Sequence, residues 1–161
     1  MEAVINRFNH TLSGILLSEG IIAFKYSPLL TWQGISYVAN DAQAFATVSP
    51  IAACPVIGAV FPDIDIHIPC LKHRTITHWP ILYGMGILLA YLAGYLWLSL
   101  FCIGCLVHIL LDSLSVMGVP VITPFGKRRG FRIMRVGSRA EFLCSVIMLD
   151  GVSCVWVAAH K

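Results

Sequence analysis

The chain has 161 residues, of which 58% are hydrophobic and only 12% are charged, and its formal net charge is +3. Soluble domains carry about twice this charged fraction, so the composition excludes an ordinary soluble domain and favours an integral membrane protein. The length is that of a single domain, which we expect to cover residues 1–161.

Five apolar segments follow one another along the chain, and we expect each to form a hydrophobic helix. They cover roughly residues 11–24, 49–61, 79–94, 95–112 and 141–159. The first lacks a small-residue cleavage site, so we expect it to be retained rather than removed as a signal peptide. The first two are short for a membrane core of ~30 Å, and little regular structure is expected over residues 25–49. The fold prediction is an all-α membrane bundle of about five helices.

The two central segments could instead form one continuous helix, because residues 81–107 contain no Asp, Glu, Lys or Arg. A single helix would place residues 78 and 112 about 50 Å apart at 1.5 Å per residue. A bend near Gly94 would bring both positions to the same end of a hairpin. We expect the hairpin if the polar residues at these two positions belong to one site.

Polar residues with metal-binding chemistry occur at the ends of the apolar segments. In chain order they are His10, Asp63, Asp65, His73, His78, His108, Asp112 and Glu141. Taken alone, a His–x3–Asp pair on a helix is more often a hydrogen-bonded structural pair, and an Asp-x-Asp after proline is more often a solvated turn. Their common location is more informative, because a chain that crosses the membrane five times brings all of them to one face. The sequence therefore predicts a single site at that face.

The basic residues predict which face this is. Six of them lie between residues 127 and 139, and Arg7, Lys72 and Arg74 belong to the same face, whereas Lys25 and Lys161 belong to the other. The positive-inside rule then places the site on the cytoplasmic face of a multi-pass inner-membrane protein. A basic loop between membrane segments is explained more simply as a topology determinant than as a nucleic-acid site, so nucleic acid is not an expected partner.

Imidazole and carboxylate donors together suit a divalent metal ion, with zinc first and manganese or iron as alternatives. His108 and Asp112 are four residues apart and share one face of a helix, so both can approach one ion. Several carboxylates also permit a site of two ions. By contrast, the single Cys102–Cys105 pair has CxxC spacing within an apolar run, and we expect buried structural thiols there.

With these motifs the chain resembles the YdjM-like family of bacterial inner-membrane proteins, which are regarded as metal-dependent hydrolases. The resemblance is carried by His10 with Gly14, Gly58 before Phe-Pro-Asp-Ile-Asp at 61–65, His-Arg-Thr-Ile-Thr-His at 73–78, His-Ile-Leu-Leu-Asp at 108–112 and Gly-Ser-Arg-Ala-Glu at 137–141. The motifs occur in the family's order over nearly the whole chain. One departure is Trp79-Pro80, where a small polar residue is expected after the histidine. The family is distantly similar to zinc-dependent phospholipases C and P1-type nucleases, which implies phosphoester hydrolysis.

The resemblance also implies roles for the candidate residues. The implied metal ligands are His10, Asp63, His78, His108 and Asp112, and the implied further ligands or partners of ligands are Asp65, His73 and Glu141. From their chemistry, Asp65 or Glu141 is the expected general base. His73 or Arg74 is expected to stabilise the negative charge that develops during reaction.

The expected function is therefore membrane-bound, metal-dependent hydrolysis of phosphoester bonds. Because the site is expected at the bilayer surface, the expected substrate is amphiphilic, such as a phosphorylated lipid. One alternative is a non-catalytic membrane protein whose metal holds the helix ends together. Another is a metal or proton transporter, which would need ionisable residues near mid-membrane, where only Glu19 and Asp150 are candidates.

Overall fold

The computed structural model describes residues 8–15, 17–18, 42–135, 138 and 143. Residues 8–15 and 17–18 are helical, in agreement with the first predicted segment. The segment predicted over residues 141–159, together with Glu141, lies outside the described residues. Glu19 and Asp150 lie outside them as well, so the roles predicted for these three residues remain predictions.

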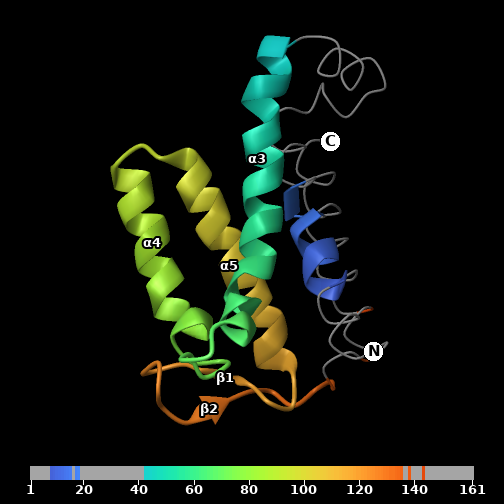
Figure 1. Cartoon of the computed structure of the whole chain (residues 1–161), viewed down its shortest axis with the longest axis vertical. Helices are drawn as coiled ribbons and strands as arrows, with labels where there is room; N and C mark the ends of the chain where they lie inside the picture. The colour runs from blue at the N-terminus through green and yellow to red at the C-terminus, as the bar shows by residue number, and fades with distance from the viewer. Residues whose placement is uncertain (1–7, 16, 19–41, 136–137, 139–142, 144–161) are drawn as a thin grey trace, which may run out of the picture.

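Three α-helices run along the long axis of the molecule (Figure 1). They are α3 Ala42–Val60, α4 Pro80–Leu92 and α5 Leu96–Leu114, and α5 packs against both of the others. Helix α3 begins seven residues earlier than predicted and continues through two prolines, Pro50 and Pro55. The expectation of little structure up to residue 49 was therefore wrong for its last part.

The central apolar run forms the hairpin and not one continuous helix. Gly94 lies between α4 and α5 with a φ of +75°, a conformation that costs glycine little. The amide of Tyr95 donates to the carbonyl of Ala90 at 2.8 Å and closes the turn. The start of α4 and the end of α5 consequently lie at the same end of the molecule (Figure 1).

Helices α3 and α5 approach each other closely because glycine occurs at their contact. A Cβ atom on Gly104 would overlap the backbone carbonyl oxygen of Pro55. Small residues at helix contacts let backbones approach in this way, as is common in membrane bundles. The buried core beside this contact contains Tyr83 and the thiols of Cys102 and Cys105. Both thiols are free and buried, as the sequence predicts.

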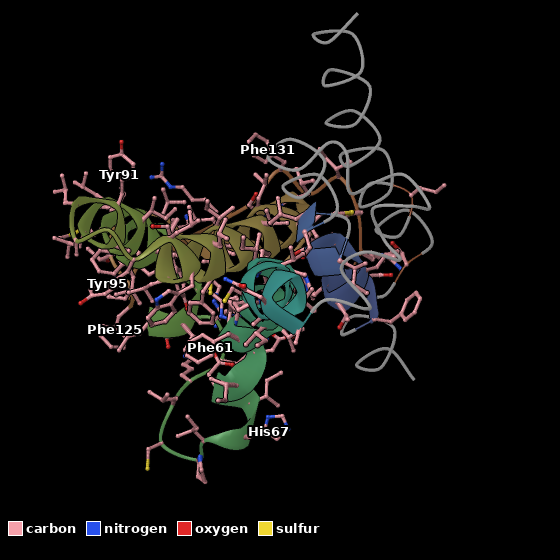
Figure 2. The ribbon with its side chains drawn as sticks, turned by 90° about the horizontal axis from the view of Figure 1, so that it is seen from above. Phe61, His67, Tyr91, Tyr95, Phe125 and Phe131 are labelled. Carbon is pink, nitrogen blue, oxygen red and sulfur yellow. The ribbon has the colours of Figure 1, made fainter. Side chains whose placement is uncertain are left out.

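The apolar surfaces of the helices suit a membrane protein. Two described stretches, Val48–His67 and Leu96–Leu114, are long and apolar enough to cross a membrane, whereas α4 has 13 residues. At 1.5 Å per residue α4 is ~20 Å long, less than a hydrocarbon core of ~30 Å. Its outer side chains are widely exposed, including Leu88 at 57% and Leu92 at 72%. Figure 2 shows Tyr91 and Tyr95 at the outer edge of the helical pair.

The remaining described elements are short and lie at the end where α3 and α5 finish. Two 3-10 helices, η2 Phe61–His67 and η3 Ile76–His78, connect α3 to α4. After α5, strand β1 Val119–Pro120 pairs antiparallel with β2 Arg128–Arg129. The chain is therefore mostly helical rather than strictly all-α. Within the described residues we find three long helices and the N-terminal helical residues, so the predicted count of five is not established.

Candidate metal centre

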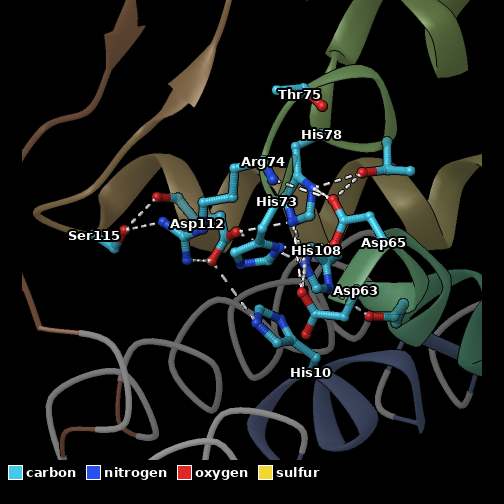
Figure 3. Close-up of polar contacts among 12 residues, drawn as sticks. His10, Asp63, Asp65, His73, Arg74, Thr75, His78, His108, Asp112 and Ser115 are labelled. Atoms are coloured by element: carbon cyan, nitrogen blue, oxygen red, sulfur yellow. Dashed lines mark hydrogen bonds and ion pairs between the residues drawn. The ribbon is translucent and has the colours of Figure 1, made fainter. Parts of the chain in front are cut away.

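Five predicted metal ligands lie together at this end of the bundle (Figure 3). They come from four elements far apart in the sequence: His10 from the N-terminal helix, Asp63 from η2, His78 from η3, and His108 and Asp112 from α5. All five are buried, and Asp63 is the most exposed at 5%. The common location that the alternating segments predict is thus present in the structure.

Two histidine nitrogens each lie close to carboxylate oxygens of Asp63 and Asp112. The Nε2 atom of His78 lies 3.3 Å from His108 Nε2, 3.6 Å from Asp63 Oδ1 and 3.3 Å from Asp112 Oδ2. The Nε2 atom of His108 lies 3.6 Å from the same Asp63 oxygen and 3.8 Å from the same Asp112 oxygen. Ligands about 2.0–2.2 Å from a tetrahedral zinc ion are separated by roughly 3.3–3.6 Å. The five distances that involve a histidine nitrogen are therefore close to those between ligands of a tetrahedral zinc ion.

The two histidines are oriented by partners on the far side of their rings. His108 Nδ1 lies 2.7 Å from the carbonyl oxygen of Ala59 and donates to it, which leaves Nε2 with its lone pair towards the centre. His78 Nδ1 lies 3.1 Å from Thr77 Oγ1 and 3.4 Å from Asp65 Oδ2. Partners of this kind fix the tautomer and direction of metal-binding histidines.

Asp63 and Asp65 have different roles because they lie on a 3-10 helix. Residues two apart on such a helix point in different directions, and here the carboxylates approach opposite nitrogens of the His78 ring. Asp63 faces the donor set, whereas Asp65 accepts hydrogen bonds from Thr77 Oγ1 and from the Arg74 amide, the latter at 3.1 Å. Asp65 is 1% exposed and engaged on both oxygens, which does not suit the predicted role of general base.

His10 extends the donor set to five residues. Its Nε2 atom is 3.8 Å from Asp112 Oδ1, and its ring stacks on that of His108 with a centroid separation of 3.7 Å. Burial, followed by the nearby His108, lowers the pKa of His10 to about 3, so the ring is neutral as a ligand must be. The N-terminal helix is held against α3, where Ser18 Oγ lies 2.7 Å from the Ala52 carbonyl oxygen.

Arg74 contacts the centre and not open solvent. Its guanidinium donates to Asp112 Oδ1 at 2.7 Å and to Ser115 Oγ at 3.2 Å, and the residue is 2% exposed. Its backbone has a φ of +60°, which non-glycine residues seldom adopt. In the structure the guanidinium pairs with Asp112, and the expected role of Arg74 in stabilising developing negative charge stays a prediction.

The charges of the centre favour a divalent cation. Among the described residues, the buried carboxylates of the site are those of Asp63, Asp65 and Asp112 and the buried guanidinium is that of Arg74, so two negative charges remain in this part of the chain when the histidines are neutral. Unpaired buried charge is costly, and a divalent ion would compensate it. Although burial opposes protonation of His78, its contacts with Asp112 and Asp63 raise its pKa above the ordinary value, so this histidine attracts positive charge.

His73 is the predicted residue that reaches the surface. Its side chain is 35% exposed, and Nδ1 lies 2.7 Å from Asp65 Oδ1. Donor atoms of Asp63, His73 and His78 also lie within 4.8 Å of one another. Sequence reasoning missed Thr77 and the Ala59 carbonyl. Thr77 is next to His78 within the 73–78 motif, so the sequence could have indicated it as a partner of that histidine. A contact through a backbone carbonyl, such as that of Ala59, cannot be inferred from residue type.

A search of protein families finds one match over most of the chain. Residues 6–160 match the model of a family described as YdjM inner membrane protein. No curated protein and no solved structure matches the chain.

Proposed function

The chain belongs to the YdjM inner membrane protein family, and we propose that it is a metal-dependent hydrolase of phosphoester bonds in an amphiphilic substrate. The observation that carries the proposal is the close approach of buried His and Asp donors: the Nε2 atoms of His78 and His108 lie 3.3 to 3.8 Å from each other and from oxygens of Asp63 and Asp112. A divalent ion held there, most suitably zinc, would polarise a phosphoryl oxygen and lower the pKa of water.

The protein's own residues divide the remaining work. The ion would be held by Asp63, His78, His108 and Asp112. His10 would be a fifth donor to this ion or a ligand of a second one. Asp65 fixes His73 through Nδ1, which leaves the half-buried ring to transfer a proton to or from the reacting group. His73 thereby replaces Asp65 as the proposed acid–base residue. Arg74 positions Asp112 and is a positioning residue rather than a substrate contact.

A hollow beside Asp63 supports an amphiphilic substrate. It has a volume of about 460 Å³, and its walls are formed mainly by apolar side chains of α3 and η2, among them Val56, Val60 and Ile64. Asp63 is part of the same wall. A molecule with an apolar chain and a phosphate at its end would place the chain in the hollow and the phosphate beside the donor set.

The basic residues support a cytoplasmic location for the centre. Lys72, Arg74 and the described basic residues from 127 to 135 all lie at the end of the bundle where α5 finishes (Figure 1). The proposed topology is a multi-pass inner-membrane protein with this end on the cytoplasmic side.

A structural metal site is the second candidate, because the four donors are almost completely buried. Closed four-ligand sites are typical of structural zinc. The part-exposed His73 and the hollow beside Asp63 favour catalysis instead. A transporter has less support, since the described ionisable residues of the site lie at one end of the helices and not along them.

The test combines metal content with activity. Detergent-purified wild-type protein should contain zinc or another transition metal by mass spectrometry, and Asp63→Ala and His108→Ala should lose it. His67→Gln is the matched control, because His67 lies on η2 outside the donor sets and should leave metal content unchanged. His73→Gln should keep the metal and lose hydrolysis of phosphoester substrates. An inactive wild type with a tightly held, non-exchanging ion would favour the structural site, and a wild type that takes up no metal would refute both.

A further inference from the structure

We propose that the segment after α5 contains a separate binding site for the phosphate group of an acidic phospholipid. The segment is the basic hairpin, defined here as residues 116–135, which includes β1 and β2. It crosses the end of the bundle below α3 and α5 in Figure 1. The inference goes beyond the proposed hydrolase, because it involves other residues and needs no metal.

The basic hairpin is fixed to the end of α5 by backbone hydrogen bonds. The amide of Phe131 donates to the Ser113 carbonyl at 2.8 Å, and the amide of Ile133 donates to the Leu114 carbonyl at 2.9 Å. In the other direction, the amide of Val116 donates to the Met134 carbonyl at 3.0 Å. These bonds, together with the pairing of β1 and β2, hold the side chains of residues 127–132 in a defined arrangement.

Four basic side chains of the hairpin surround one hollow. Lys127, Arg128, Arg129 and Arg132 line a space of about 320 Å³, and Val116 and Met117 contribute to the same lining. This volume lies at the lower end of the range for small-molecule sites, ~300–1,000 Å³. Arginine forks match the oxygens of a phosphate, so the lining suits a phosphate-bearing ligand.

The positive charge of the hollow is not balanced within the described part of the chain. The carboxylates that the structure describes are those of Asp63, Asp65 and Asp112, and all three belong to the metal centre. None of the four basic side chains forms an ion pair with them. Several cations held together without a counter-charge attract an anion.

Exposed apolar side chains beside the cations favour a lipid as the source of the phosphate. Ile122 is 67% exposed, Phe125 75% and Phe131 73%, and Figure 2 shows the two phenylalanines on the periphery of the molecule. Aromatic and aliphatic side chains next to basic ones are typical of surfaces that lie in the membrane interface. A free phosphate ion would use only the cations, whereas an acidic phospholipid would use both kinds of residue.

The proposed lipid site adjoins the metal centre through a contact of Arg128. The guanidinium of Arg128, which lines the hollow, donates to the carbonyl of His73 at 2.6 Å. Because Arg128 contacts the backbone of His73, a lipid in the hollow would lie close to this part-exposed histidine, whose ring is bound to Asp65. For this reason Arg128 is left unchanged in the test below.

The test measures lipid binding to detergent-purified, chelator-treated protein. Because no metal is needed for this binding, the result can be interpreted even if the hydrolase proposal fails. Native mass spectrometry should show preferential retention of phosphatidylglycerol over phosphatidylcholine. The affinity of the double variant Arg129→Gln/Arg132→Gln for phosphatidylglycerol should be roughly ten- to thirtyfold lower, because each basic residue contributes about 1 kcal/mol to binding at an anionic lipid surface. Arg129→Lys/Arg132→Lys keeps the charge and should retain most of the binding.

Arg135→Gln is the matched control, because Arg135 is an exposed cation of the same hairpin that does not line the hollow. It should bind as the wild type does. Equal retention of the two lipids by the wild type would overturn the proposal, as would an unaffected double variant. Displacement of the lipid by millimolar inorganic phosphate would assign the site to free phosphate, and displacement by a short RNA at low micromolar concentration would assign it to nucleic acid. Either result would overturn the lipid assignment.

Discussion

Replacing Arg74 with glutamine should make the stability of the protein depend on metal. Arg74 and Asp112 are 2% and 1% exposed, and their charged groups are 2.7 Å apart. Removal of one partner from a buried ion pair costs about 3–5 kcal/mol, because the other charge stays buried without compensation. In the variant the centre would hold three uncompensated negative charges where the wild type holds two.

The expected effect is large enough to measure by thermal unfolding. For a chain of this length 1 kcal/mol shifts Tm by roughly 2–4 °C, so the chelator-treated variant should melt about 6–20 °C below wild type. Zinc should recover part of this loss, because a ligand at 100 times its Kd adds about 2.7 kcal/mol to the folded state. The zinc-induced rise in Tm should be larger for the variant than for the wild type, since the ion meets more negative charge.

Arg135→Gln serves as the control, because this exposed cation forms no ion pair with a carboxylate of the described residues, and its loss should change stability by less than about 0.5 kcal/mol. The reasoning fails if Arg74→Gln melts with the wild type in chelator. It also fails if zinc raises Tm equally in both proteins, since the guanidinium would then not be compensating a metal-binding carboxylate.

Three further predictions concern the acid–base residue, the ligands and the helix contact. His73→Gln should lower the rate of phosphoester hydrolysis by about 10²- to 10⁴-fold at unchanged metal content, and an equal loss of metal would contradict the proposed role. Metal occupancy, measured by mass spectrometry at fixed free zinc, should fall as pH decreases through a value above 6.5, because the raised pKa of His78 lets protons compete for Nε2. An occupancy that stays constant from pH 8 to pH 5 would exclude His78 as a ligand. Gly104→Leu should reduce the yield of folded protein in size-exclusion chromatography, because the side chain would collide with the Pro55 backbone, whereas Gly84→Leu, in open space, should not.

The sequence predicts the location of the site better than its detailed contacts. The convergence of His10, Asp63, His78 and Asp112 follows from the alternating direction of successive helices. The hairpin at Gly94 follows from the requirement that residues 78 and 112 lie at the same end of the bundle. Both features depend on the lengths of the apolar segments and on the rise per residue of a helix, which can be read from the sequence.

The contacts of Asp65 and Arg74 depend on local backbone geometry that no periodic pattern reports. The 3-10 conformation after α3 sends Asp65 to the far side of the His78 ring, and a positive φ turns Arg74 towards Asp112. The start of α3 was missed because the residues before Ser49 belong to a mixed polar and aromatic stretch that has no helical pattern of apolar residues. The β1–β2 ladder has two residues in each strand, too few for an alternating pattern.

The order of the donors along the chain has a consequence for biosynthesis. The N-terminal donor His10 and the last one, Asp112, are separated by most of the described chain, and the hairpin of α4 and α5 must be complete before they meet. A ribosome-bound intermediate that has released only α3 therefore presents isolated histidines and aspartates, which bind ions weakly. The mature donor set arises only after α5 has been synthesised and has packed against α3, so metal would be bound late in the biosynthesis of the protein.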